Sequence, residues 1–223
     1  MKKKLSLLCN LFVAIMTLAA WCIAAFRVNP DALLVSRGLE NLKYFTVLSN
    51  LLNDAVSLVY AIALLRLLRA GSGEIARPLQ CLKLAAAAAV GLTFLVIALF
   101  LGPLYGHRYM YSGSNLWYHL VLPLVSMLEL CLLDREPVLP FRDTLWAGLP
   151  ALLYGCGYTL NLLLNGIGVW PDTNDFYGFV NWGWGVGFLI FGSIVLASWL
   201  LAVLLRALSL LGTARAMRAE MQP

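Results

Sequence analysis

Six apolar runs, each of roughly 20 residues, constrain the fold of this chain more than any other feature. A helix of that length crosses the hydrocarbon core of a bilayer, which is about 30 Å thick. Because no water reaches the backbone inside that core, each span has to satisfy its peptide groups within a helix. The spans are predicted at 5–26, 44–65, 80–101, 116–133, 144–164 and 183–205.

The composition agrees with a membrane protein. Of the 223 residues, 61% are hydrophobic and 12% are charged, whereas a soluble domain has about 25% charged residues. The connections between the spans are short, so residues 1–223 are predicted to form a single all-α integral membrane domain. The first apolar run is longer than a signal-peptide core and lacks a small-residue cleavage pattern, so it is interpreted as a retained span.

The placement of basic residues predicts the orientation, because cytoplasmic loops carry an excess of lysine and arginine. With the N-terminus inside, the inner segments hold twelve of the sixteen basic residues; these segments are 1–4, 66–83, 134–143 and 206–223. Both termini are therefore predicted to be cytoplasmic. The net charge of +5 reflects the same bias and attraction to anionic lipid headgroups, and it does not indicate nucleic-acid binding.

A ladder of polar side chains follows one face of the second span. Its members, separated by steps of four, three, one and three, are Thr46, Asn50, Asn53, Asp54 and Ser57. A polar group inside a span is costly unless it finds a partner or water. This face is therefore predicted to point into the bundle, with Asp54 either protonated or partnered.

Two further spans carry polar stripes. In the fifth span the stripe consists of Tyr154, Tyr158, Asn161 and Asn165, and in the fourth span of His119, Ser126 and Glu129. His119 and Ser126 are two helical turns apart and share a face, whereas Glu129 is predicted to face a neighbouring groove. Pro123 lacks an N–H group, so the carbonyl of His119 is expected to lose its helical partner, with a kink and a small polar gap.

Thr46 and His119 are predicted to lie at the same depth, each about one turn below the outer surface. A hydroxyl and an imidazole at one depth suggest nucleophilic catalysis, in which histidine accepts the threonine proton as the Oγ atom attacks an acyl carbon. Asn50, one turn deeper, would then donate to the developing oxyanion. Spacing alone leaves open the alternative that His119 is a hydrogen-bonded packing residue.

Two stretches of the sequence resemble a known family. Residues 44–50 (YFTVLSN) and 119–123 (HLVLP) resemble signature stretches of bacterial six-span membrane proteins related to the androgen-induced and androgen-dependent TFPI-regulating protein family. Eukaryotic members are transmembrane threonine hydrolases of fatty acid esters of hydroxy fatty acids. The resemblance implies that Thr46 is the nucleophile, that His119 is the base, and that the protein lies in the bacterial cytoplasmic (inner) membrane. It assigns no role to Asp54.

The resulting prediction is an enzyme that hydrolyses, or transfers the acyl group of, a lipid ester near the outer leaflet. Support for the substrate or the oxyanion is expected from Asn50, Ser49, Asn53, Asn161, Asn165 and Tyr158. A buried polar or proton path is expected from Asp54, Glu129 and Ser126. No metal or other cofactor is predicted, because no metal-ligand spacing occurs.

Two other classes of function stay open at this point. One is a small proton-coupled transporter or channel with a polar path through Asp54, although the chain lacks an inverted repeat and paired broken helices. The other is a structural membrane protein without catalysis. Loss of function in Asp54→Asn but not in Thr46→Ala would favour transport.

Overall fold

The computed structural model describes residues 2–26, 38–134, 139–169 and 172–220 of the chain. In these ranges the chain is helical, contains no strand, and has six helical segments long and apolar enough to cross a membrane. The segments are Lys2–Ala24, Phe45–Ala70, Arg77–Tyr105, Ser114–Leu132, Phe141–Asn165 and Trp184–Gly212. The predicted all-α fold class is confirmed, and the six segments coincide with the six predicted spans, with ends that differ by one to seven residues.

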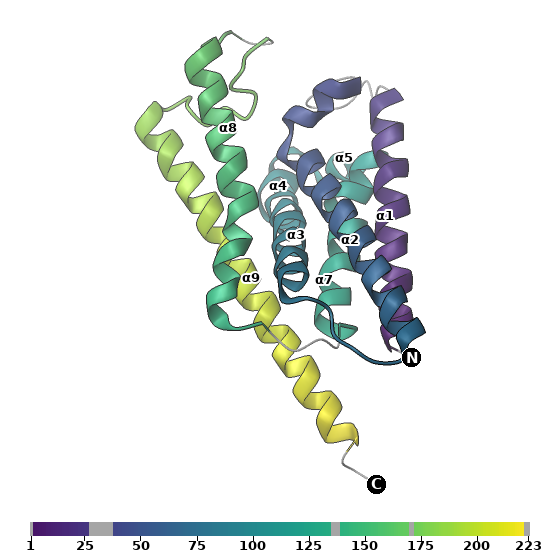
Figure 1. The fold of residues 1–223 in the computed structure, drawn as a ribbon. Helices are drawn as coiled ribbons and strands as arrows, with labels where there is room; N and C mark the ends of the chain where they lie inside the picture. Colours follow the sequence, from purple (N-terminus) through teal and green to yellow (C-terminus); the bar gives the residue numbers. More distant parts are fainter. Residues whose placement is uncertain (1, 27–37, 135–138, 170–171, 221–223) are drawn as a thin grey trace.

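Six long helices and several short segments build these spans (Figure 1). The long helices are α1 Lys2–Phe26, α2 Phe45–Ala70, α3 Arg77–Val96, α7 Leu122–Leu132, α8 Leu149–Asn165 and α9 Trp184–Glu220. The 3-10 helices are η1 Gly38–Lys43 and η4 Phe141–Gly148, and the π-helical turns are η2 Ile97–Leu101 and η3 Trp117–Val121. The short helices are α4 Gly102–Tyr105, α5 His107–Met110 and α6 Ser114–Leu116.

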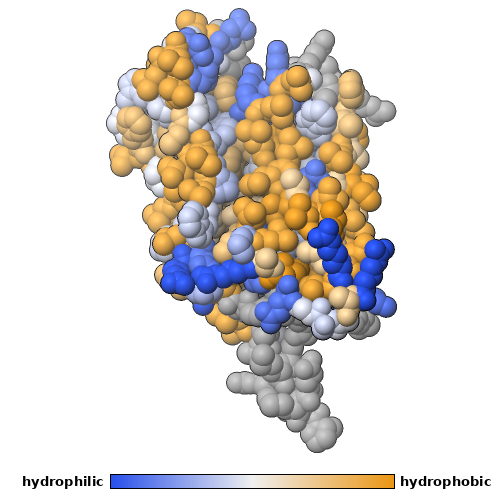
Figure 2. All heavy atoms as spheres, viewed as in Figure 1, coloured by the Kyte–Doolittle hydropathy of each residue, from blue (hydrophilic) through white to orange (hydrophobic). Residues whose placement is uncertain are grey.

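Helix α3 lies at the centre of the bundle and packs against α2, α7 and α9. Its middle is the alanine run 85–89, all of which is buried. Small side chains let neighbouring membrane helices approach closely, which accounts for the central place of this helix. Helix α1 begins and α9 ends at the same end of the bundle, as six spans require (Figure 1). Hydrophilic residues lie at this end beneath a hydrophobic belt (Figure 2). Arg69 in the last turn of α2, Arg77 at the start of α3 and Arg142 in η4 are among them, and we call this the basic end.

Helices α8 and α9 form a pair that leans against one side of the other four spans (Figure 1). Near the basic end the pair is packed tightly, with Ala147 and Ala202 in one cluster with Leu84 and Ala88 of α3. An ion pair fastens the same region, because Arg77 Nε and Nη2 each donate to the Asp143 carboxylate at 2.6 Å. Toward the opposite end α8 leans away from α2, as Figure 1 shows.

Helix α9 lies close to the backbone at the end of α7 at Gly212. A Cβ atom at this position would lie 2.7 Å from the Cys131 carbonyl oxygen, a backbone atom that moves only with its helix. We therefore expect Gly212→Ala to lower the free energy of unfolding by ~1–3 kcal/mol, measured by thermal unfolding in detergent. In the control Gly192→Ala, the new Cβ has no neighbour within 4 Å. That variant should be as stable as wild type or more stable, and equal losses in both would contradict the prediction.

At the π-turn η2, a side chain replaces the backbone hydrogen bond that is lost next to a proline inside a span. The Gly102 N–H donates to Ile97 O, five residues back, and Pro103 has no N–H. The Ala98 carbonyl thereby loses both of its helical donors. The ring of His107 replaces them, with Nε2 at 3.2 Å from Ala98 O.

Candidate functional site

The π-turn η3, next to Pro123, repeats this arrangement with a partner from another helix. The Leu122 N–H donates to Trp117 O, five residues back, so the Tyr118 carbonyl loses its helical donors. Asn50 Nδ2 donates to this carbonyl at 3.3 Å. The break predicted at Pro123 thus takes the form of a π-turn. It frees the carbonyl of Tyr118, whereas the four-residue spacing of an α-helix had indicated the carbonyl of His119. Such turns are frequent at functional sites.

The Asn50 amide joins two elements of the candidate site. Its Nδ2 also donates to Thr46 O at 2.8 Å, so one buried side chain holds the backbone at Thr46 and at Tyr118. Both of its N–H groups are thus occupied, while its buried Oδ1 has no hydrogen-bond partner. Asn50 therefore positions α2 against η3, and it is not a free donor for the oxyanion role that the sequence suggested.

Loss of this bridge should be measurable as a loss of stability. Asn50→Ala leaves the buried Tyr118 carbonyl without its donor, so we expect unfolding to be easier by ~1–3 kcal/mol. The control is Asn161→Ala, at an exposed asparagine pair, where we expect a change within about 0.5 kcal/mol. Thermal unfolding in detergent compares the two variants. Similar losses at both positions would show that the Asn50 bridge does not stabilise the fold.

His119 is held in a defined orientation. The residue is 8% exposed, and its Nδ1 lies 2.9 Å from Met110 O, the carbonyl at the end of α5. Because a carbonyl oxygen only accepts hydrogen bonds, this contact assigns the proton to Nδ1 and leaves a lone pair on Nε2. An imidazole of this tautomer can act as a base through Nε2.

Thr46 lies in the first turn of α2 and is partly buried. Among the described residues no hydrogen bond joins its hydroxyl to His119. The structure does place both residues on the elements that Asn50 joins, so they belong to one region of the protein. Their pairing as nucleophile and base stays a prediction.

The deeper ladder residues face the interior, as predicted. Asn53 Nδ2 donates to Ser126 Oγ on α7 at 2.8 Å, and both residues are buried. Ser49 Oγ donates to Thr46 O at 3.1 Å and lies 3.4 Å from Thr93 Oγ1 on α3. These contacts attach α2 to α3 and α7 through polar groups that satisfy one another.

Asp54 does not follow this pattern. It is partly exposed, and its buried Oδ1 atom has no hydrogen-bond partner. Within the described ranges no hydrogen bond or ion pair joins it to Ser126 or Glu129. The polar path predicted from these three residues is therefore not connected in this structure.

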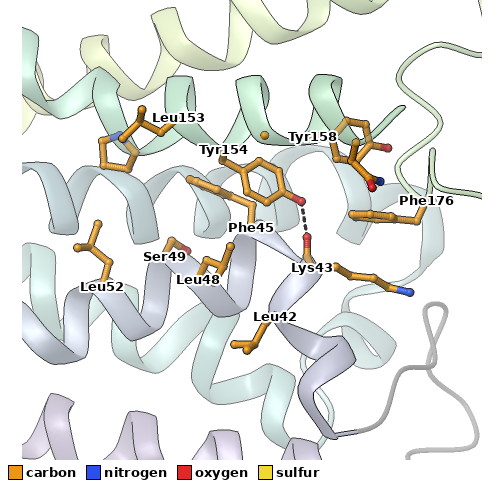
Figure 3. A pocket seen from close by; sticks show the side chains of 13 residues that line it. Leu42, Lys43, Phe45, Leu48, Ser49, Leu52, Leu153, Tyr154, Tyr158 and Phe176 are labelled. Atoms are coloured by element: carbon orange, nitrogen blue, oxygen red, sulfur yellow. Dashed lines mark hydrogen bonds between the residues drawn. The ribbon is translucent and has the colours of Figure 1, made fainter. Parts of the chain in front are cut away.

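Asn161, Asn165 and Tyr158, the expected support residues of the fifth span, lie on α8. Asn165 Nδ2 donates to Asn161 Oδ1 at 2.8 Å in an exposed pair. Tyr158 OH donates to Asp175 Oδ1 at 2.6 Å. Tyr158 and Asn161 line a cavity of about 500 Å³ between α2 and α8, together with Ser49 (Figure 3). Neither Thr46 nor His119 is among the residues that line it.

Phe176 lines the cavity at the end away from the basic end, next to a group of aromatic residues that contact the start of α2. The Phe45 N–H donates to the Tyr177 hydroxyl at 3.0 Å. Burial raises the pKa of Tyr177 to about 12, so its hydroxyl stays protonated at neutral pH. Tyr44 and Phe176 pack edge to face at 5.3 Å. These contacts fix the start of α2 against the segment that precedes α9.

The most highly charged buried cluster lies nearer the basic end and was not predicted from the sequence. Lys83 Nζ lies 2.6 Å from Glu129 Oε2, and the two side chains are 7% and 3% exposed. Ser6 donates to the other oxygen of Glu129. Lys83 Nζ also lies 3.9 Å from Asp134 Oδ2 and 3.4 Å from the ring centroid of Tyr60. Asp134, just after α7, accepts a hydrogen bond from Tyr60 OH at 2.7 Å. The cluster therefore joins four helices: α1, α2, α3 and α7.

Lys83 was predicted within the span 80–101 and was also counted in the inner segment 66–83; the structure buries it within α3, which begins at Arg77. A signal was present: a single base and a single acid, Lys83 and Glu129, interrupt apolar stretches near the same end of two spans. Opposite charges at matching depth favour pairing, since each is costly alone in a membrane. Glu129 is buried, as predicted, but its partners are Lys83 and Ser6.

Comparison of the chain with protein-family models, curated proteins and solved structures found no match. Membership of the six-span family therefore stays a prediction from the signature residues around Thr46 and His119. What the structure shows is a membrane protein of six helical spans.

Proposed function

We propose that this protein is an intramembrane enzyme that hydrolyses an ester-linked lipid or transfers its acyl group, with Thr46 as nucleophile and His119 as base. The Asn50 amide carries the proposal, because it bonds to the carbonyls of Thr46 and of Tyr118, the neighbour of His119. The tautomer of His119 supports the same role, since Nε2 is left as the acceptor. The resemblance of the same residues to threonine hydrolases agrees with it.

The reaction would proceed in two steps. His119 Nε2 accepts the proton of Thr46 as its Oγ1 attacks the ester carbon, and the imidazolium then protonates the leaving alcohol. Water then attacks the acyl-threonine while His119 Nε2 accepts a proton from it, and the imidazolium returns this proton to Thr46 Oγ1 as the C–O bond breaks, which gives the acid and regenerates Thr46 and neutral His119. An alcohol in place of water would give acyl transfer instead of hydrolysis.

The start of α2 supplies the positive potential for the oxyanion. Helix α2 begins at Phe45, so the Thr46 N–H is one of the first four, which lack an intrahelical acceptor. The helix dipole is positive at this end, and a developing negative charge beside Thr46 gains from it. Asn50, predicted to support the oxyanion, then only positions α2 against η3. Ser49, also predicted as a support residue, contributes through its hydrogen bond to Thr46 O.

The charge distribution supports cytoplasmic termini, and the resemblance to the six-span family supports a placement in a bacterial inner membrane. Thr46 and His119 would then lie beneath the periplasmic surface. A lipid ester would enter sideways from the outer leaflet, and no metal or other cofactor takes part.

The test is covalent labelling of the purified protein by a fluorophosphonate probe, followed by peptide mapping. We expect the label on Thr46 and hydrolysis of at least one lipid ester from a panel of neutral and anionic esters. The control Ser193→Ala, which removes an exposed hydroxyl on α9, should label like wild type. Labelling that persists in Thr46→Ala would overturn the proposal. Loss of function only in Asp54→Asn would favour the transport alternative.

A further inference from the structure

The cavity between α2 and α8, whose lining residues Figure 3 shows, reaches the surface of the bundle. Leu48 and Leu153 line it from the two helices and are 39% and 67% exposed, so its edges reach the surface of the bundle. In a protein of six spans that surface is in contact with acyl chains. The volume of about 500 Å³ lies within the range of about 300–1,000 Å³ typical of small-molecule sites.

The walls of this cavity are apolar because its tyrosine hydroxyls are already occupied. Tyr154 OH donates to Lys43 O at 2.6 Å, and Tyr158 OH donates to Asp175 at 2.6 Å. Besides Ser49 and Asn161, what remains for a ligand is the faces of the rings and the leucine side chains of both helices. Such a wall suits a hydrocarbon chain and offers few partners to a peptide.

The mouth of the cavity carries a positive charge. Among the described residues that line it, Lys43 is the charged one. Its Nζ lies 5.4 Å from the ring centroid of Tyr44 and 5.5 Å from that of Phe176, so the ammonium is held at the mouth, where Figure 3 shows it extended beneath Phe176. The neighbouring carboxylate, Asp175, is buried and accepts from Tyr158 and from the N–H groups of Phe179 and Val180.

We propose that this cavity binds an anionic phospholipid, with one acyl chain between α2 and α8 and the phosphate paired with Lys43. The positive start of α2, two residues beyond Lys43, favours an anion at the same place. A lipid without a phosphate group would leave the ammonium unpaired. The inference goes beyond the proposed function, because it concerns binding and holds whether or not Thr46 is catalytic.

Two glycines provide a matched pair of variants. Gly157 lines the cavity and Gly192 lies on α9 outside it, and a Cβ at either position meets nothing within 4 Å. Gly157→Leu should fill the cavity, whereas Gly192→Leu adds the same side chain to another exposed helix surface. Both substitutions replace glycine by a better helix former, so their effects on folding should be alike.

The experiment uses the full chain in phosphatidylcholine vesicles that contain a trace of phosphatidylglycerol with a photoreactive acyl chain. Crosslinked peptides are identified by mass spectrometry. We expect crosslinks on α2 and α8 in wild type and in Gly192→Leu, and only background in Gly157→Leu. Lys43→Gln should reduce crosslinking about fivefold, and Lys43→Arg should restore it.

Competitors identify the anion. Unlabelled phosphatidylglycerol should displace the probe, whereas oleate and inorganic phosphate at equal concentration should not. Equal crosslinking in the two leucine variants, or equal displacement by oleate, would overturn the proposal. Thr46→Ala should bind like wild type, so a failure of the proposed catalysis would leave this result unchanged. Retained crosslinking in Lys43→Gln would show that the phosphate is not at Lys43.

Discussion

Thr46→Ala is expected to reduce hydrolysis of the lipid ester to background, and His119→Ala to lower kcat/KM by about 10²–10⁴-fold, the range for loss of a general base. The reason is that the first variant lacks the nucleophile and the second lacks the acceptor for its proton. Thr46→Ser keeps a hydroxyl at the same place and should keep part of the activity. The measurement is kcat/KM for the ester that wild type hydrolyses fastest in the panel.

Two comparisons make this result specific. His107→Ala removes the other histidine, which bonds to the Ala98 carbonyl beside the other π-turn, and it should leave the rate unchanged. The double variant Thr46→Ala/His119→Ala should be no slower than Thr46→Ala, because residues that act as a unit are not additive. A loss in His107→Ala equal to that in His119→Ala would instead indicate a general effect on the fold.

The second large effect is expected at the buried ion pair. Lys83→Met leaves the Glu129 carboxylate buried without its counter-charge, and such a change costs about 3–5 kcal/mol. Lys83→Met combined with Glu129→Leu removes both charges, and its unfolding free energy should be close to that of wild type or higher. Thermal unfolding in detergent, with helical circular dichroism as the signal, compares the single and double variants.

The control for the ion pair is Arg142→Met at the surface. Arg142 Nε lies 4.0 Å from Asp143, and its side chain is 78% exposed, so its loss should cost less than about 1 kcal/mol. If Lys83→Met were no more destabilised than Arg142→Met, the buried pair would have no structural role. If the double variant lost as much unfolding free energy as Lys83→Met, the cause would be altered packing and not the unpaired charge.

The six spans could be predicted because a bilayer imposes a length on every helix that crosses it. The predicted span 80–101 already contained Lys83, but the same residue was also counted in the inner segment 66–83, and span length alone does not indicate that its charge is buried. The structure continues α3 back to Arg77 and buries Lys83 against Glu129. That contact joins two spans far apart in the sequence, and local periodicity contains no information about which helices will be neighbours.

The candidate site was predictable only in part. The helical period correctly predicted that Asn50 and Asn53 point inward. It did not predict which groups they bond to. Those partners depend on the rotation of α7 and on the π-turn at Trp117–Val121, where five-residue spacing replaces four. Asn161 and Asn165 share a stripe with Tyr158, yet they pair with each other at the surface, because α8 leans away from α2. Helix tilt of this kind is a property of tertiary packing.

The charged cluster of Ser6, Tyr60, Lys83, Glu129 and Asp134 has a consequence for biosynthesis. All five residues precede the fifth span, so a ribosome delivers the complete cluster before α8 and α9 are made. Until Glu129 emerges, Lys83 can keep its ammonium at the lipid headgroups through its long stem. When the fourth hydrophobic segment is inserted, Lys83 can pair with Glu129 inside the bundle. The first four spans can then pack together before α8 and α9 pack against them.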